Sequence, residues 1–167
     1  MTEQVQSYLA LGSNVGDKLA SMRGALAAIA ALPGTRLVRV SGAYRTPPWG
    51  KTDQDWFANA AAEITTTLPP LALLDAVLAI EAGLGRERRE RWGPRIIDID
   101  LLTHGDTHMR DERLTLPHPF MHQRAFVLVP LQEIAPDLVV AGKRIPTWLA
   151  HLDQSDISRI ASLTQEA

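Results

Sequence analysis

Cysteine is absent from the 167-residue sequence, and its absence excludes disulfides, thiolate zinc sites, iron–sulfur ligation and a cysteine nucleophile. Long apolar runs are also missing, since no stretch approaches the ~18 residues that a bilayer-spanning helix needs. The polar residues 1–6 and the short apolar run at 8–11 do not resemble a secretory signal. We therefore expect a cytoplasmic protein with no membrane partner.

Lysine is scarce: the 17 basic residues comprise 14 arginines and only 3 lysines. The formal net charge is −2, which speaks against a basic surface for duplex nucleic acid, so we expect no nucleic-acid partner. Eight of the arginines lie between Arg86 and Arg124. Because a guanidinium group suits bidentate contact with phosphate, this local cluster indicates a phosphate site.

The length favours one domain spanning residues 1–167, with a composition of 46% hydrophobic and 22% charged residues that is typical of globular proteins. Apolar periodicity, Pro and Gly positions give the expected elements. They are strands at 5–11, 36–44, 57–67 and 95–103; helices at 19–30, 70–83 and 121–134; a hairpin at 104–113 around Gly105; long loops at 46–55 and 86–94; and short helices near Trp148 and after Asp153.

This order of elements, βαββαβ followed by a C-terminal extension, is typical of the ferredoxin-like architecture. We therefore predict an α+β fold in which helices pack on an antiparallel sheet. The architecture alone does not identify a function, because it is shared by enzymes, regulators and RNA-binding domains.

Asp98 and Asp100 are the first candidate site. On a strand, residues i and i+2 face the same side, so both carboxylates point one way while Ile97, Ile99 and Leu101 point into the core. Adjacent carboxylates repel each other unless a cation lies between them, and Mg²⁺ is commonly held by one or two carboxylates together with substrate phosphates. Taken alone, the pair is explained slightly better by the solvated outer face of an edge strand.

The loop before this strand shifts the balance toward a phosphate site. Residues 86–95 carry five arginines, and arginines beside a dicarboxylate metal site are the components of phosphoryl transfer. Further on, His118 lies between two prolines that fix its backbone, where it could donate to a phosphate or a leaving group. A structural hydrogen bond is an equally good explanation of a lone histidine.

Two earlier segments are weaker candidates. The turn Gly12-Ser13-Asn14 could cradle an anion with backbone amides, although it is neither a Walker A nor a Rossmann motif. Thr46 to Trp49, close to Phe57 and Asn59, could bind a flat heterocycle by stacking and by backbone hydrogen bonds. A structural turn and a loop that caps the core are the simpler interpretations.

Five motifs resemble those of the 6-hydroxymethyl-7,8-dihydropterin pyrophosphokinase family, in the family's order, from about Tyr8 to Pro136. The most specific is the run RWGPRIIDID at residues 91–100. The others are Gly12-Ser13-Asn14, Tyr44-Arg45-Thr46-Pro47-Pro48, Asn59-Ala60-Ala61 and Leu116-Pro117-His118-Pro119.

The resemblance implies transfer of pyrophosphate from ATP to the hydroxymethyl group of the pterin, with release of AMP, as a step of tetrahydrofolate biosynthesis. It implies two Mg²⁺ ions between ATP and the acid pair Asp98 and Asp100. The residues and the resemblance together favour in-line attack on the β-phosphorus of ATP, and we expect a monomer whose partners are small molecules. For the pterin it implies Thr46, Pro47, Trp49, Phe57, Asn59 and Phe126. For ATP it implies Glu81, Arg88, Trp92, Arg95, Leu101, Arg113, Thr115, His118 and Arg124. For catalysis it implies Arg86, Arg88 and Arg95 beside the aspartates.

The sequence departs from the family pattern at several positions. Phe57 stands where many members have Tyr, so stacking is kept and a hydroxyl is lost. The arginine loop is one residue short, which leaves the phosphate role open between Arg88 and Arg89. Leu78 replaces a polar residue near the adenine, and Pro119 replaces an aromatic residue, so we expect no stacking there.

Two other classes of function remain as alternatives. One is a nucleotide-sensing domain without chemistry, which would not need the paired aspartates. The other is a single-strand RNA binder, which would need an RNP-like aromatic run that the sequence lacks. Detection of AMP after mixing with ATP and pterin separates the enzyme from the sensing domain, and filter binding to RNA tests the RNA-binding class.

Overall fold

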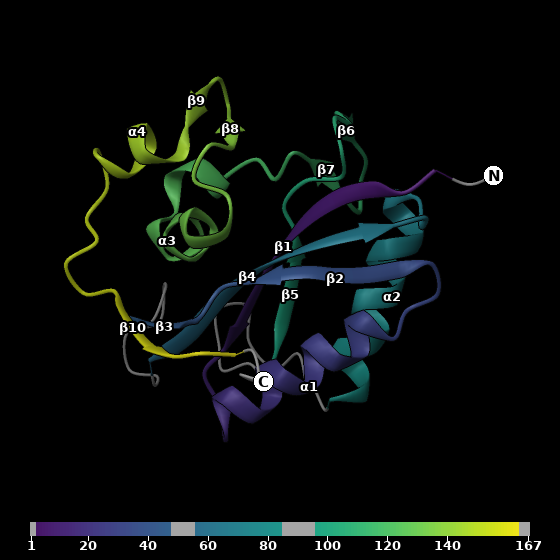
Figure 1. Cartoon of the computed structure of the whole chain (residues 1–167), viewed down its shortest axis with the longest axis horizontal. Coiled ribbons are helices and arrows are strands. Elements are labelled where there is room, and N and C mark those ends of the chain that lie inside the picture. The colour runs from purple at the N-terminus through teal and green to yellow at the C-terminus, as the bar shows by residue number, and fades with distance from the viewer. Residues whose placement is uncertain (1–2, 48–55, 85–95, 164–167) are drawn as a thin grey trace.

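The computed structural model describes residues 3–47, 56–84 and 96–163. Within these ranges the chain forms a six-stranded antiparallel sheet with strand order β10-β3-β4-β1-β5, in which β2 also pairs with β4 (Figure 1). The strands are β1 (Val5–Ser13), β2 (Thr35–Val40), β3 (Ala43–Thr46), β4 (Phe57–Thr66), β5 (Asp98–Leu101) and β10 (Ser158–Ala161).

Helices α1 (Lys18–Ala30) and α2 (Pro70–Gly83) cover one face of the sheet (Figure 1). The Asp17 side chain caps α1 by accepting from the backbone N–H of Ala20 at 3.0 Å, and α2 begins with proline at its first position. Both helices were predicted, and their apolar sides pack on strand residues such as Leu9, Leu11 and Ile99.

Helices α3 (Ala125–Ile134) and α4 (Ile145–Leu149) cover the other face, with the short 3-10 helix η1 (Met121–Gln123) before α3 (Figure 1). They pack on Tyr8 and Ala61 in a second apolar cluster. Two small ladders complete the structure: β6 (Met109–Arg110) pairs with β7 (Thr115–Leu116), and β8 (Val139–Val140) pairs with β9 (Lys143–Arg144).

The predicted α+β class and antiparallel sheet are confirmed, but the strand predicted at 36–44 is two strands. The strand is interrupted at Ser41 and Gly42, where side chains take part in hydrogen bonds with the backbone. The Ser41 hydroxyl accepts from the Ala61 N–H at 2.9 Å, and the Gly42 N–H donates to the Glu133 carboxylate at 3.1 and 3.2 Å. This interruption separates β2 from β3, and β3 then pairs with β10.

Two further expectations were wrong in their details. The predicted hairpin does not turn at Gly105, because β6 and β7 pair around residues 111–114, where Asp111 N and Leu114 O are bonded. The segment after Asp153 is strand β10 and not a helix, because its backbone pairs with β3. The short helix near Trp148 is confirmed as α4.

None of the helices in the described ranges has the length and apolar character that crossing a bilayer requires.

Candidate active site

The two aspartates lie on one face of β5, as their spacing predicted. Ile99 and Leu101 are buried on the opposite face, whereas Asp98 is half-buried and Asp100 is exposed. In the sheet, Asp98 lies opposite Gly12 of β1, and Gly12 in turn lies opposite Asn59 of β4. Since directly paired residues point to the same face, a carboxylate and a carboxamide flank one glycine in a single row.

Glu81, near the end of α2, holds the strand between the two aspartates. Its carboxylate Oε2 accepts from the backbone N–H of Ile99 at 2.7 Å, and the residue is only 4% exposed. The resemblance implies a contact of Glu81 to ATP, and that contact stays a prediction. The described hydrogen bond instead ties α2 to the backbone of β5.

The aspartate pair suits a hard cation that brings further ligands with it. Among the described residues, no group of three His, Asp or Glu side chains gathers to form a complete metal cage. Mg²⁺ does not need such a cage, because it usually retains waters and binds through one or two carboxylates and substrate phosphates. Asp98 and Asp100 therefore fit Mg²⁺ that arrives with a nucleotide.

A cavity of about 280 Å³ lies beside Asp100, and we call it the nucleotide-side cavity. Among the residues predicted for ATP, Arg113, Thr115 and His118 line it, and Leu101 contributes from its buried position on β5. The exposed Arg113 guanidinium forms an ion pair with Asp75 of α2. The structure thus brings these predicted residues together on the same side of the aspartate pair.

His118 is a neutral hydrogen-bond donor at pH 7. Burial, followed by the positive charge of Arg124, lowers its pKa to about 4. Its Nδ1 accepts from the backbone N–H of Phe120 at 3.2 Å, so the neutral ring carries its proton on Nε2. The ring can therefore donate one hydrogen bond from Nε2 to an anionic ligand in the nucleotide-side cavity.

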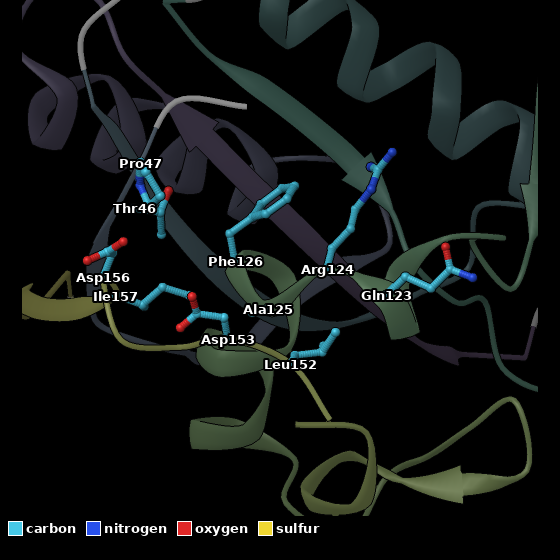
Figure 2. Close-up of a pocket in the computed structure, with 10 residues that line it drawn as sticks. All are labelled: Thr46, Pro47, Gln123, Arg124, Ala125, Phe126, Leu152, Asp153, Asp156 and Ile157. Atoms are coloured by element: carbon cyan, nitrogen blue, oxygen red, sulfur yellow. The ribbon is translucent and has the colours of Figure 1, made fainter. Parts of the chain in front are cut away.

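A second cavity, of about 260 Å³, lies near the end of β3, and we call it the pterin-side cavity. Thr46, Pro47 and Phe126, all predicted for the pterin, line it (Figure 2). Figure 2 shows the Phe126 ring between the end of β3 and Arg124. Gln123, Arg124 and Ala125 also line it, and the rest of the wall comes from the C-terminal segment, through Leu152, Asp153, Asp156 and Ile157.

The Asn59 carboxamide is fixed next to this cavity. Its Nδ2 donates to Thr46 Oγ1 at 2.6 Å, and both residues are buried. A Cβ at Gly12 would lie only 2.8 Å from Asn59 Oδ1, so glycine is needed there to leave room for the amide. Phe57 is half-buried and lies opposite Thr46 in the sheet.

Arg124 connects the two cavities. It lines the pterin-side cavity, and its charge acts on His118, which lines the nucleotide-side cavity. Its guanidinium carbon lies 5.8 Å from the centre of the Phe126 ring. A single cation therefore lines one cavity and acts on a histidine of the other.

The other predicted residues lie outside the described ranges. They are Trp49, Arg86, Arg88, Trp92 and Arg95, together with the neighbouring Arg89. Their roles stay predictions.

Sequence reasoning missed the network around Glu133 of α3. Its carboxylate accepts from the Tyr44 hydroxyl at 2.6 Å, from the Gly42 N–H, and from Arg159 Nε at 3.2 Å. Burial and the bond to Glu133 raise the pKa of Tyr44 to about 12. The network joins α3, β3 and β10. The first two contribute residues to the pterin-side cavity, and β10 begins directly after the lining residue Ile157. No local sequence pattern marks this network.

Comparison with known proteins identifies the family of the chain. Residues 8–136 match the model of the 7,8-dihydro-6-hydroxymethylpterin-pyrophosphokinase family. The chain is 58% identical over 155 residues to the 2-amino-4-hydroxy-6-hydroxymethyldihydropteridine pyrophosphokinase of Methylorubrum extorquens, covering 93% of this chain and 98% of that protein. It is 46% identical over 145 residues to the enzyme of the same name from Haemophilus influenzae, covering 87% of this chain and 91% of that protein.

Solved structures share the fold at low sequence identity. A Plasmodium falciparum HPPK-DHPS triple mutant superposes with a TM-score of 0.75 at 16% identity, covering 90% of this chain and 44% of that one. The wild-type Plasmodium falciparum HPPK-DHPS with pterin and p-hydroxybenzoate superposes with a TM-score of 0.74 at 15% identity, covering 95% of this chain and 47% of that one. The chain spans under half the length of these two proteins, and at this identity the match concerns the fold alone. From the family match and the close relatives, we conclude that the chain belongs to the 7,8-dihydro-6-hydroxymethylpterin-pyrophosphokinase family.

Proposed function

We propose that this pterin pyrophosphokinase of folate biosynthesis binds ATP in the nucleotide-side cavity and 6-hydroxymethyl-7,8-dihydropterin in the pterin-side cavity. Pyrophosphate then passes from ATP to the hydroxymethyl oxygen across the face that carries Asp98 and Asp100. The oxygen forms a bond to the β-phosphorus, and the bond from that phosphorus to the α–β bridging oxygen breaks. AMP leaves with the bridging oxygen, and the hydroxyl proton passes to Asp100 or to water.

The row Asp98, Gly12, Asn59 carries this proposal. Adjacent strands are about 4.8 Å apart, so a carboxylate and a carboxamide two strands apart are separated by roughly 10 Å. A pterin whose edge is held by Asn59 can then extend its hydroxymethyl group toward the phosphates beside Asp98. Glycine between them leaves the path open, because it has no side chain.

The phosphates would be held by groups from both sides of the cavity. His118 donates from Nε2, and Arg113 and Arg124 supply guanidinium groups with several donors each. When bound at Asp98 and Asp100, Mg²⁺ supplies neutralisation of the charge that develops on the phosphate oxygens, and we propose two ions. Orientation of both substrates on one face supplies the rest of the rate enhancement.

Replacement of the aspartates tests this assignment. We expect Asp98→Asn and Asp100→Asn to lower kcat by about 100-fold or more in an assay of AMP released from ATP, Mg²⁺ and the pterin. Asp106→Asn, in an exposed turn, is the matched control and should keep wild-type kinetics. Circular dichroism checks that each variant is folded, and wild-type turnover in folded Asp98→Asn would contradict the assignment.

A further inference from the structure

Phe120 is an exposed aromatic side chain next to the site. It precedes η1 and is 50% exposed, and it is the only aromatic residue among the large hydrophobic side chains that are exposed in the described ranges. A phenyl ring on the surface contributes little to the hydrophobic core. A role for Phe120 must therefore come from its contacts with neighbouring side chains.

Those neighbours are Arg124 and His118. The Arg124 guanidinium carbon lies 5.6 Å from the centre of the Phe120 ring and 5.8 Å from the centre of the Phe126 ring. The Phe120 and His118 rings meet edge to face, with centres 6.3 Å apart. Arg124 thus contacts two phenyl rings, one from the residue before η1 and one from α3.

The backbone holds Phe120 in place. Its N–H donates to His118 Nδ1 at 3.2 Å, and its carbonyl accepts from the Gln123 N–H at 3.0 Å. This tight turn returns the chain so that Phe120 and Arg124, four residues apart, lie side by side. The ring position is therefore defined by local hydrogen bonds although the ring is half exposed.

An aromatic ring can orient an arginine without neutralising it. The face of the ring attracts the cation through its quadrupole and does not occupy the N–H donors. A carboxylate would also fix the side chain, but it would compete with a phosphate for the same donors. Aromatic contacts are therefore suited to an arginine that must receive an anion.

We propose that Phe120 is a positioning residue that, with Phe126, holds the Arg124 guanidinium at the junction of the two cavities. The inference rests on the role of Arg124 in the proposed function. Phe120 acts through Arg124 and touches neither substrate in this proposal. Its removal should therefore matter only while Arg124 is present.

Steady-state kinetics of Phe120→Ala, Phe120→Leu and Phe120→Tyr test this inference. A cation–π contact at an exposed site corresponds to about a 2- to 5-fold change in an equilibrium. We expect Ala and Leu to lower kcat/KM by about that factor, and Tyr, which keeps the ring, to retain wild-type values. Val139→Ala removes another exposed apolar side chain, on β8, and is the matched control that should change nothing.

A double-mutant cycle with Arg124→Gln separates positioning from general structure. We expect Phe120→Ala to have no further effect in the Arg124→Gln background, while both single variants keep the wild-type melting temperature within a few degrees. Equal losses from Phe120→Ala in both backgrounds would overturn the inference. A lower kcat/KM in Arg124→Gln together with a wild-type kcat/KM in Phe120→Ala would overturn the inference about Phe120 and leave the proposed function intact. A wild-type kcat/KM in Arg124→Gln would overturn the proposed role of Arg124 and, with it, the inference about Phe120.

Discussion

The Glu81 carboxylate accepts a hydrogen bond from the Ile99 backbone N–H at 2.7 Å, between the two aspartates of β5. Among the described residues, β5 pairs only with β1, so this N–H points away from the sheet. A side chain of α2 thus takes the place of a neighbouring strand. The two carboxylates that we assign to Mg²⁺ are presented by a strand that Glu81 holds.

Glu81→Ala should destabilise the protein and weaken binding of magnesium–ATP. An unsatisfied buried N–H costs about 1–3 kcal/mol, so we expect the free energy of unfolding in urea to fall by that amount. Glu81→Gln keeps an acceptor oxygen and should lose less. An unfolding free energy of Glu81→Ala equal to that of the wild type would show that the bond contributes nothing.

Gly12→Ala should impair pterin binding and leave ATP binding intact. The new methyl group would lie 2.8 Å from Asn59 Oδ1 and would displace the amide from Thr46. We expect the KM for the pterin to rise by about tenfold, because this factor corresponds to the loss of one to two hydrogen bonds. Gly24→Ala is the control, since its methyl group would make only an ordinary 3.5 Å contact with Leu84; an unchanged pterin KM in Gly12→Ala would refute the assignment of Asn59.

His118 should make stability depend on pH in the acidic range. Its pKa is about 4 in the folded protein and ordinarily 6.5, so between these values the unfolded chain binds more protons. The stability associated with the neutral, half-buried ring is complete above pH 6.5 and is lost as the pH falls toward 4. Urea titrations between pH 4.5 and 7 measure this slope.

His118→Gln should flatten the slope, because the amide does not titrate. His151→Gln, at an exposed histidine, is the matched control and should leave the slope unchanged. A slope that persists in full in His118→Gln would assign it to another group.

Glu133→Gln should lower the pKa of Tyr44 from about 12 toward its ordinary value of 10. Burial would still raise it, but the bond to the charged carboxylate would be gone. Because the folded state favours the protonated phenol, the wild type should lose stability as the pH rises from 10 toward 12. Ultraviolet titration of the phenolate measures the shift, and Tyr44→Phe should abolish the transition that is assigned to Tyr44.

Much of the candidate site followed from local sequence patterns. The alternation of Asp98, Ile99 and Asp100 fixed which side chains share a face, since strand periodicity depends on the backbone alone. The helices predicted at 19–30 and 70–83 match α1 and α2 closely, because a capping side chain and an initial proline define where a helix begins. The resemblance then supplied the grouping of distant residues into two substrate sites.

Long-range contacts could not be predicted in this way. The bond from Glu81 to Ile99 joins a side chain to a backbone group 18 residues away. Every residue except proline has a backbone N–H, so the amino-acid sequence does not indicate which one Glu81 will bind. Strand β10 has the exposed pattern of a loop, and it becomes a strand only because β3 offers an open edge. The contact of Phe120 with Arg124 could not be predicted either, because it depends on the turn before η1.

The pairing of β10 with β3 also bears on where the protein can be shortened. The family match ends at residue 136, whereas β10 covers the edge of β3 and its Arg159 bonds to Glu133. A chain cut at that point would leave the hydrogen-bonding groups of β3 open, and such edges recruit strands from other molecules. Self-association of the shortened chain, detectable by light scattering, is therefore the expected result of removing a segment that the family match does not include.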